Sequence, residues 1–474
     1  MKICVDPEKC EGHNRCYALA PELFEVDELG LAVAKNDGVV PEGLEDKADL
    51  AIANCPEFAI EIVEEEPREG CPVEDWATDY DLMDEGYNKN PGPVWKDLRE
   101  RCPIAHSTRW GGSWMPTRYE DVREMARAAP ALSNRSPGII PPAPEMREML
   151  IKEVKEFGAE LPPISSDPPE HKPFKQLILP LFSPMAVESY RPFTEKLAHE
   201  LIDKFIETGK ADGAVDFAQQ IPPRVIAEII GIDAGRADEF TTWVRGILEE
   251  GQTDPEARLV NRRLIRDFFQ EMIEERRDAP RDDAISKLMT AEVDGKPLSD
   301  YTVIGVCFLL LVAGIDTTWS SIGSALWHFG THPEDRKRMH AEPDLFPTAI
   351  EELLRYYSPV KMARRVTEPV RFGDVDMVPG EKVIMNFPAA NRDPEVFDRP
   401  DDVVLDRERN RHIAFGVGIH RCAGSNLARM EMDAALRVWF ERIGDFEVTD
   451  PGAVRWSGGQ VRGPRILPMR VTAR

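Results

Sequence analysis

The sequence is poor in positive charge and in cysteine. It has 59 Lys and Arg residues against 85 Asp and Glu residues, which gives a formal net charge of −26 at pH 7. Nucleic-acid binding depends on Lys and Arg side chains that neutralise phosphates, so this balance excludes a nucleic-acid partner. Eight cysteines in 474 residues are too few for a disulfide scaffold. We therefore expect a cytoplasmic protein whose cysteines are available as metal ligands.

Long apolar runs are also missing. The longest, residues 303–315, contains two glycines and ends at Asp316, and it is shorter than the ~18 residues that a membrane-spanning helix needs. The N-terminus lacks the cationic segment followed by an apolar stretch that is typical of a signal peptide. No Gly-x-Gly-x-x-Gly follows a predicted strand, which excludes the common flavin- or NAD-binding motif. We expect no membrane anchor and no built-in reductase.

The remaining composition is that of a globular protein with two parts. Apolar residues make up 42% and charged residues 30% of the chain, which is an ordinary soluble profile. A chain of 474 residues exceeds one typical core, so a large and a small domain are expected. Residues 1–65, with 16 acidic and 5 basic side chains, predict the small domain. The acidic, Pro- and Gly-containing residues 66–78 predict a linker, and residues 79–474 predict the large domain.

The small domain carries cysteines at metal-ligand spacing. Cys10 and Cys16 are separated by five residues, and Cys55 stands before a proline. They resemble the iron–sulfur ferredoxins in which a Cys-x2-Cys-x2-Cys run is completed by a remote Cys-Pro, with His13 replacing the middle cysteine. The resemblance implies a small α+β ferredoxin-like domain with a 3Fe-4S cluster on Cys10, Cys16 and Cys55. The alternatives are a 4Fe-4S cluster with His13 as an extra ligand, and a zinc site or scattered thiols.

The strongest motif of the large domain is the stretch Phe415–Gly424, Phe-Gly-Val-Gly-Ile-His-Arg-Cys-Ala-Gly. Its glycines allow positive φ and a close approach of the backbone to a flat group. Cys422 precedes a predicted helix that begins near Ser425, and the positive end of a helix lowers a thiol pKa and favours a thiolate. A thiolate is a strong axial ligand for iron. The alternative is a buried cysteine beside a glycine turn.

The stretch resembles the haem-binding loop of the cytochrome P-450 family, in its bacterial soluble form. The resemblance implies a mainly α-helical cytochrome P-450 fold with small β-sheets, and haem b ligated by Cys422. The residues that it implies in binding the haem are His171, Lys175, Arg364, Phe415 and His420. Lys175 stands where the family usually has Arg, which loses the bidentate fork. Arg365 is adjacent to Arg364, so that assignment could be off by one. The resemblance also makes Glu352 and Arg355 a structural pair, one helical turn apart.

A long predicted helix after Ser299 carries the sequence Ala-Gly-Ile-Asp-Thr around Asp316. An acid beside a hydroxyl in an apolar helix is costly unless it has a use, and Gly314 leaves a gap in the side-chain surface. This part resembles the central helix of the same family, which implies proton delivery by Asp316 and hydrogen bonding by Thr317. The alternative is a capping or kink pair in a buried helix.

Together the two resemblances imply a haem-thiolate monooxygenase. One oxygen atom of O2 would enter a small apolar organic substrate, and the other would leave as water. Electrons would come from a separate NAD(P)H-dependent ferredoxin reductase through the fused iron–sulfur domain. The alternatives are a redox or gas sensor that uses haem and cluster, and a peroxide-driven peroxygenase.

Overall fold

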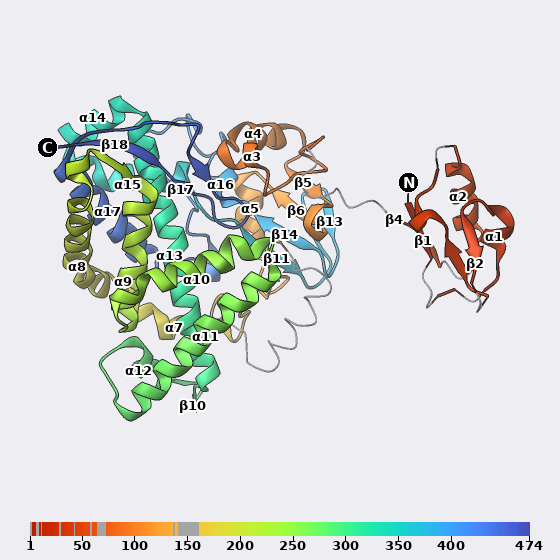
Figure 1. Ribbon diagram of the computed structural model, residues 1–474, viewed down its shortest axis with the longest axis horizontal. Helices are drawn as coiled ribbons and strands as arrows, with labels where there is room; N and C mark the ends of the chain where they lie inside the picture. Colours follow the sequence, from red (N-terminus) through yellow and green to blue (C-terminus); the bar gives the residue numbers. More distant parts are fainter. Residues whose placement is uncertain are drawn as a thin grey trace. The chain divides into compact units, whose positions relative to one another are not determined.

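The computed structural model describes residues 2–5, 9–10, 12–27, 30–41, 43–56, 59–63, 73–135, 138–140 and 161–474. The chain forms two compact units, residues 1–72 and residues 73–474 (Figure 1). Of the predicted linker, residues 66–72 lie outside the described part. Residues 73–78 instead belong to the second unit, where the His106 N–H donates to the Ala77 carbonyl oxygen at 3.1 Å.

The first unit is a small α+β structure, as predicted. Strand β1 (Lys2–Val5) pairs antiparallel with β4 (Ile60–Val63), so the two ends of the unit lie side by side. Its other elements are the hairpin β2 (Phe24–Val26) and β3 (Ala32–Ala34) and the helices α1 (Arg15–Leu19) and α2 (Glu45–Ala53). Small and apolar side chains fill the core between these elements, among them Ile3, Phe24 and Ala48.

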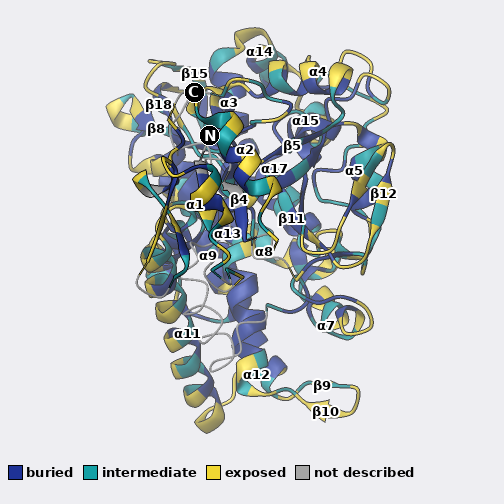
Figure 2. Ribbon diagram, turned by 90° about the vertical axis from the view of Figure 1, so that its right-hand side faces the viewer, coloured by how far each residue is buried: buried dark blue, intermediate teal, exposed yellow. Residues whose placement is uncertain are grey.

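The second unit is mainly helical, with small sheets. Its helices are α3 (Glu85–Lys89), α4 (Gly92–Arg101), α5 (Tyr119–Met125), α7 (His171–Ile178), α8 (Pro184–Asp203), α9 (Ile221–Ile230), α10 (Ala237–Leu248), α11 (Pro255–Asp278), α12 (Ala284–Met289), α13 (Asp300–Thr331), α14 (Pro333–Ala341), α15 (Phe346–Tyr356), α16 (Phe387–Ala390) and α17 (Ser425–Arg442). Residues 184–296 lie mostly in amphipathic helices. Along α11, for example, buried and exposed residues alternate as expected for one face against the core (Figure 2).

Helix α13 is the centre of this unit, and α9, α10, α11 and α17 pack against it (Figure 1). Ser299 caps its N-terminus, because the Ser299 side chain accepts from the Thr302 N–H at 3.2 Å. The helix is long and apolar enough to cross a membrane by length and composition, although its uninterrupted apolar run, residues 303–315, is shorter than a membrane span. However, 72% of its most apolar window is buried inside the protein, as expected for a core helix.

The largest sheet has five strands in the order β5-β6-β14-β11-β7. These strands are β5 (Ile104–Ser107), β6 (Ser113–Pro116), β14 (Lys382–Met385), β11 (Met362–Val366) and β7 (Leu132–Ser133). The β14–β6 pair is parallel and the other pairs are antiparallel. A three-stranded sheet is formed by β15 (Ile443–Val448), β18 (Pro468–Ala473) and β8 (Lys210–Asp212).

Three two-stranded ribbons complete the second unit. They are β9 (Glu292–Val293) with β10 (Lys296–Pro297), β12 (Val370–Phe372) with β13 (Val375–Met377), and β16 (Arg455–Trp456) with β17 (Pro464–Ile466). The last ribbon matters for the site, because β17 packs against α13.

Candidate active site

The loop that carries Cys422 is folded back on itself. The Cys422 N–H donates to the Phe415 carbonyl oxygen at 2.8 Å, and Gly416 and Gly418 have φ values of +67° and +75°. The expected need for glycine is therefore met at these two positions. Gly424 differs, because its φ is −82°. A Cβ there would lie 4.0 Å from the Cys422 Sγ, an ordinary van der Waals distance, so the local geometry does not require glycine at this position.

The protonation of Cys422 corrects one expectation. Burial raises the pKa of the Cys422 thiol, although the Gly424 N–H and the positive charges of Lys175, Arg421 and Arg429 act to lower it. The residue is exposed to solvent, yet many protein atoms surround its sulfur. Their effect on the pKa is larger than that of the groups that lower it. The end of α17 alone therefore does not produce a thiolate, contrary to the prediction. A metal ion deprotonates a thiol that coordinates it, so ionisation of Cys422 depends on the bound iron.

Four predicted haem-binding side chains lie together beside this loop. The rings of His171 and His420 stand edge to face with centroids 4.3 Å apart. Burial lowers the pKa of His420 to about 3, and His171, Arg364 and Lys175 add to this effect. Among the described residues, the His420 Nε2 is buried without a hydrogen-bond partner. A carboxylate of a haem would supply the partner that His420 Nε2 lacks, next to the cationic Arg364 and Lys175, so this group of side chains fits the predicted cofactor.

The strand β11 settles which of its two adjacent arginines faces inward. Arg364 is buried whereas Arg365 is exposed, because successive side chains of a strand point to opposite faces. Burial lowers the pKa of Arg364 to about 10, while Asp167 acts to raise it. Arg364 is thus the one of the pair that can reach an internal anion.

Lys175 makes contacts that the sequence did not predict. Its Nζ donates to the Ile419 carbonyl oxygen at 3.0 Å and also to the Arg421 carbonyl oxygen. Both carbonyls belong to the loop just before Cys422. Lys175 therefore fastens α7 to the cysteine loop, in addition to standing among the cationic groups.

The acid–alcohol pair of α13 points in two directions. Asp316 is 1% exposed, and its Oδ1 accepts from Arg465 Nη2 at 2.6 Å and from Ser320 Oγ at 3.4 Å. Burial raises the pKa of Asp316 to about 6. Thr317 is half-buried and donates from Oγ1 to the Ala313 carbonyl oxygen at 2.9 Å. Because Ala313 is exposed within an otherwise buried helix, Thr317 and Ala313 mark the open face of α13.

The structure gives a different reason for a glycine at position 314 from the one predicted from sequence. A Cβ at this position would lie 2.6 Å from side-chain atoms of Ile226 on α9, closer than real contacts allow. The glycine gap is therefore filled by a neighbouring helix, and it serves the packing of α9 against α13.

In the first unit, the three predicted thiols surround one pocket. The pocket is lined by Val5, Cys10, His13, Asn14, Arg15, Cys16, Ala32, Cys55, Pro56, Ala59 and Ile60. Burial raises the pKa of Cys16, and Cys10 and Cys55 are close enough to add to this effect. The Ala59 N–H donates to the Cys55 Sγ at 3.3 Å, which leaves that sulfur fixed in orientation.

The donor set of this pocket is three thiols, the ligand type of an iron–sulfur cluster. Within the described ranges, no three His, Cys, Asp or Glu side chains converge as ligands of one metal ion. An iron–sulfur cluster holds its thiolates farther apart, because each binds a different iron. The donor set of three sulfurs therefore fits such a cluster.

Comparison with known proteins assigns both units. A family model described as Cytochrome P450 matches residues 252–449, and one described as 4Fe-4S single cluster domain matches residues 3–62. Cytochrome P450 107B1 of Saccharopolyspora erythraea is 36% identical over 367 residues, which span 76% of this chain and 89% of that protein. The chain belongs to the cytochrome P450 family.

Other relatives agree in fold and in reaction class. The mycinamicin IV hydroxylase/epoxidase of Micromonospora griseorubida is 34% identical over 79% of this chain and 94% of its own length. The structure of cytochrome P450 CYP109Q5 from Chondromyces apiculatus superposes with a TM-score of 0.75 at 31% identity, over 84% of this chain and 100% of that one. The predicted fold is confirmed. This cytochrome P450 is a monooxygenase that uses haem, O2, an organic substrate and a redox partner, and its N-terminal unit is of the iron–sulfur type.

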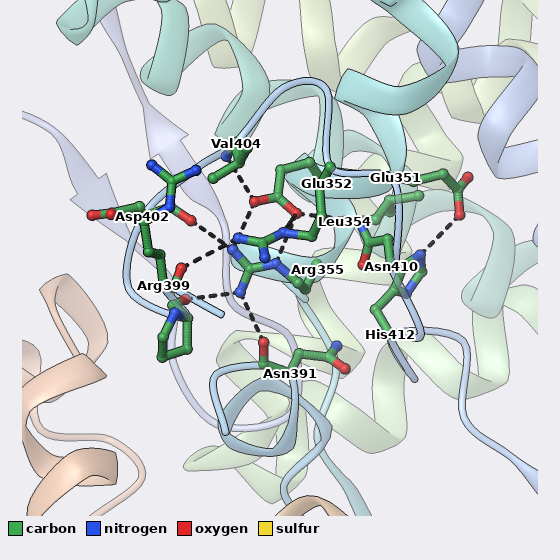
Figure 3. A network of polar contacts seen from close by, with 12 residues as sticks. Glu351, Glu352, Leu354, Arg355, Asn391, Arg399, Asp402, Val404, Asn410 and His412 are labelled. Atoms are coloured by element: carbon green, nitrogen blue, oxygen red, sulfur yellow. Dashed lines mark hydrogen bonds and ion pairs between the residues drawn. The ribbon is translucent and has the colours of Figure 1, made fainter. Parts of the chain in front are cut away.

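The structural pair of this P450 is fully buried on α15. Arg355 donates from Nε and Nη2 to the two carboxylate oxygens of Glu352, each at 2.8 Å (Figure 3). Its remaining donors reach backbone carbonyl oxygens, which are those of Asn391, Pro400 and Asp402. Sequence reasoning found no third partner for the pair. Arg407 is that partner, with Nε 2.9 Å from Glu352 Oε2.

Sequence reasoning also missed two charged groups near the site. Arg465 pairs with Asp316 across 149 positions of sequence, and no local signal could have revealed it. Arg429 lies with its Cζ 4.5 Å from the centre of the Phe415 ring and is paired with Glu351. Its place seven residues after Cys422, on the predicted helix, was a signal that could have been used.

Proposed function

We propose that this P450 inserts one oxygen atom of O2 into an apolar organic substrate with electrons delivered through its own N-terminal iron–sulfur unit. The second oxygen leaves as water, which consumes two electrons and two protons. A separate NAD(P)H-dependent ferredoxin reductase supplies the electrons. The observation that carries the proposal is the presence of the three-thiol pocket and the Cys422 loop in one chain.

The haem, when bound, supplies the redox chemistry that activates O2. The chain's own residues bind and orient it. Cys422 would bind the iron, and His171, Arg364 and His420 would hold the propionates, supported by the convergence of these three side chains and by the unpaired Nε2 of His420 within the described residues. Lys175 belongs to the same group and also holds the loop.

Phe415, one of the predicted haem-binding residues, acts through the conformation of the Cys422 loop. Phe415 lies under the guanidinium of Arg429, 4.5 Å from ring centre to Cζ, and its carbonyl oxygen accepts from the Cys422 N–H. A fixed Phe415 therefore fixes the backbone that carries the sulfur.

We assign proton delivery to Asp316 and hydrogen bonding at the open face of α13 to Thr317. A pKa of about 6, raised by burial, allows Asp316 both to hold and to release a proton near neutral pH. The proton has a defined place, the Oδ2, which is buried and has no hydrogen-bond partner in the part of the chain that the structure describes. Thr317 stands one turn from the exposed Ala313 and offers a hydroxyl on that face.

We propose a 3Fe-4S cluster on Cys10, Cys16 and Cys55. Three thiols line the pocket, and His13 takes the position of the middle cysteine of the Cys-x2-Cys-x2-Cys run. The matching family is described by a 4Fe-4S cluster, so the alternative is a 4Fe-4S cluster with His13 as its fourth ligand. Iron and acid-labile sulfide analysis separates the two.

The substrate is proposed to be apolar, and the location cytoplasmic. The face of α13 around the open position is formed by Leu309, Val312 and Ala313, which offer no charge. The related mycinamicin IV hydroxylase/epoxidase and the cyclomarin C epoxidase CymV of Salinispora arenicola are named for large organic substrates. The proposed division is an iron–sulfur domain over 1–65 and a haem domain that extends to residue 474.

The test is turnover with a cluster ligand removed. Cys55→Ala should abolish product formation driven by ferredoxin reductase, NAD(P)H and O2, while Cys4→Ser, at an exposed thiol outside the pocket, should leave it unchanged. The purified chain alone should not oxidise NAD(P)H. Wild-type turnover by Cys55→Ala with the same reductase would refute the electron route. Product from peroxide alone at the full rate would favour a peroxygenase, and the absence of any product would favour a sensor.

A further inference from the structure

The buried acid of α13 shares its cation with a second carboxylate. Arg465 on β17 is 7% exposed. Its Nη2 donates to Asp316 at 2.6 Å and its Nη1 donates to Ser320 Oγ at 2.9 Å, whereas its Nε forms an ion pair with Glu249. One guanidinium therefore lies between two carboxylates, which cannot both be fully neutralised by it.

Glu249 belongs to a different part of the fold from Asp316. It follows α10 directly and begins the connection to α11, which includes the short 3-10 helix η8 (Glu250–Gln252). Its other carboxylate oxygen accepts from Arg245 Nε at 3.3 Å. The ion pair Glu249–Arg465 thus joins the α10–α11 connection to the strand that faces α13.

The same connection is fastened to the β16–β17 ribbon at a second point. Gln252 donates from Nε2 to the Gly458 carbonyl oxygen at 3.3 Å, and its Oε1 accepts from the Gln460 N–H at 3.2 Å. Both partners lie in the turn between β16 and β17. A displacement of the α10–α11 connection would therefore also displace the β16–β17 ribbon, which carries Arg465.

This coupling bears on the protonation of Asp316, because both Arg465 and Glu249 act on its pKa. Burial raises the pKa of Asp316, Arg465 lowers it, and Glu249 raises it. Arg465 from β17 and Glu249 from the end of α10 are the charged groups that act on Asp316 in the described structure, and Arg245 reaches it only through Glu249. Withdrawal of Glu249 would leave the guanidinium to Asp316 alone, which favours the ionised carboxylate.

We propose that Glu249 is a positioning residue for Asp316: by sharing Arg465, it keeps a proton on Asp316 while the α10–α11 connection is packed against the β16–β17 ribbon. Proton supply at α13 is then linked to the packing of a surface connection. The link rests on the proposed role of Asp316 in proton delivery. The step moves one proton, which Asp316 Oδ2 holds and releases, and Glu249 exchanges none.

The decisive measurement is the protonation of Asp316 itself in the haem-loaded full chain. The carbonyl stretch of its protonated carboxyl, identified by its loss in Asp316→Asn, is followed by infrared spectroscopy against pH. Glu249→Gln should lower the midpoint by about one pH unit, a tenfold change in the protonation constant, because a like charge is removed. Glu250→Gln, at the exposed neighbouring acid, should leave the midpoint unchanged.

Two further variants test the positioning role. Glu249→Asp, which keeps the charge, should restore the wild-type midpoint at least in part. Gln252→Ala, which releases the connection without changing charge, should shift the midpoint in the same direction as Glu249→Gln. An unchanged or raised midpoint in Glu249→Gln overturns the proposal, and an unchanged midpoint in Gln252→Ala overturns its link to the connection.

Turnover separates this inference from the proposed function. Product formed per NAD(P)H consumed should fall in Asp316→Asn, and its pH profile should move to lower pH in Glu249→Gln. If the infrared midpoint shifts but Asp316→Asn stays fully coupled, Glu249 controls Asp316 and the proton-delivery role fails. If Asp316→Asn uncouples and the midpoint does not shift, the role of Asp316 stands and that of Glu249 fails.

Discussion

Replacing Arg355 by methionine should destabilise the haem-binding unit by about 3–5 kcal/mol, the cost of breaking a buried ion pair. Arg355 and Glu352 are both fully buried. The guanidinium makes five hydrogen bonds at 2.7–2.9 Å, two to Glu352 and three to backbone carbonyl oxygens (Figure 3). All of its N–H donors are therefore used.

The magnitude follows from what the substitution leaves behind. Methionine fills much of the volume but donates no hydrogen bond, so three carbonyl oxygens lose a partner. Glu352 keeps Arg407, the Val404 N–H and Asn410, so its charge is still partly compensated, which argues against a loss above this range. Arg355→Lys keeps the charge with three donors instead of five and should give an intermediate loss.

Denaturant unfolding of the haem-loaded full chain, followed by far-ultraviolet circular dichroism, measures this loss, because the long helices lie in the second unit. The matched control is Arg338→Met. Arg338 is 38% exposed and pairs with Glu342 and Asp406 at the surface, so its loss should cost only about 0–1 kcal/mol. Equal losses in the free energy of unfolding for Arg355→Met and Arg338→Met would refute the reasoning that burial makes the Glu352–Arg355 pair more stabilising than a surface pair.

Two further predictions concern charge and cluster type. Although burial acts to raise it, hydrogen bonds from Arg429 and His412 lower the pKa of Glu351 to about 2 from the usual 4.5. The stabilisation that the Glu351 carboxylate gives is therefore complete above pH 4.5 and lost as the pH falls toward 2. The free energies of unfolding of wild type and Glu351→Gln should differ by about 2 kcal/mol at pH 6 and converge near pH 2. A difference that stays constant with pH would contradict this. His13→Cys should raise the iron content from three to four per cluster and change the electron paramagnetic resonance of the oxidised protein, whereas an unchanged spectrum would mean that His13 is not at the fourth position.

Contacts within one turn or one loop were open to prediction from sequence. Glu352 and Arg355 are one helical turn apart, and this spacing brings them together in any helix. Gly416 and Gly418 of the Cys422 loop adopt positive φ as their residue type suggested. The three cysteines of the first unit and the N-cap of α13 were equally local signals.

Contacts between distant segments were not open to prediction in this way. The pairing of Asp316 with Arg465, of Glu352 with Arg407, and the filling of Gly314 by Ile226 depend on how helices and strands pack. A sequence window holds no measure of that packing.

The amino-acid sequence by itself indicated the candidate iron ligands, because Cys422 and the three thiols of the first unit lie in short segments whose geometry is local. The tertiary structure alone decided the surroundings that shift the pKa of these and other groups. Burial raises the pKa of the Cys422 thiol, and it also raises the pKa of Asp316, which Arg465 lowers and Glu249 raises further. A pKa depends on the solvent excluded and the charges nearby, and both arise only when distant parts of the chain pack together.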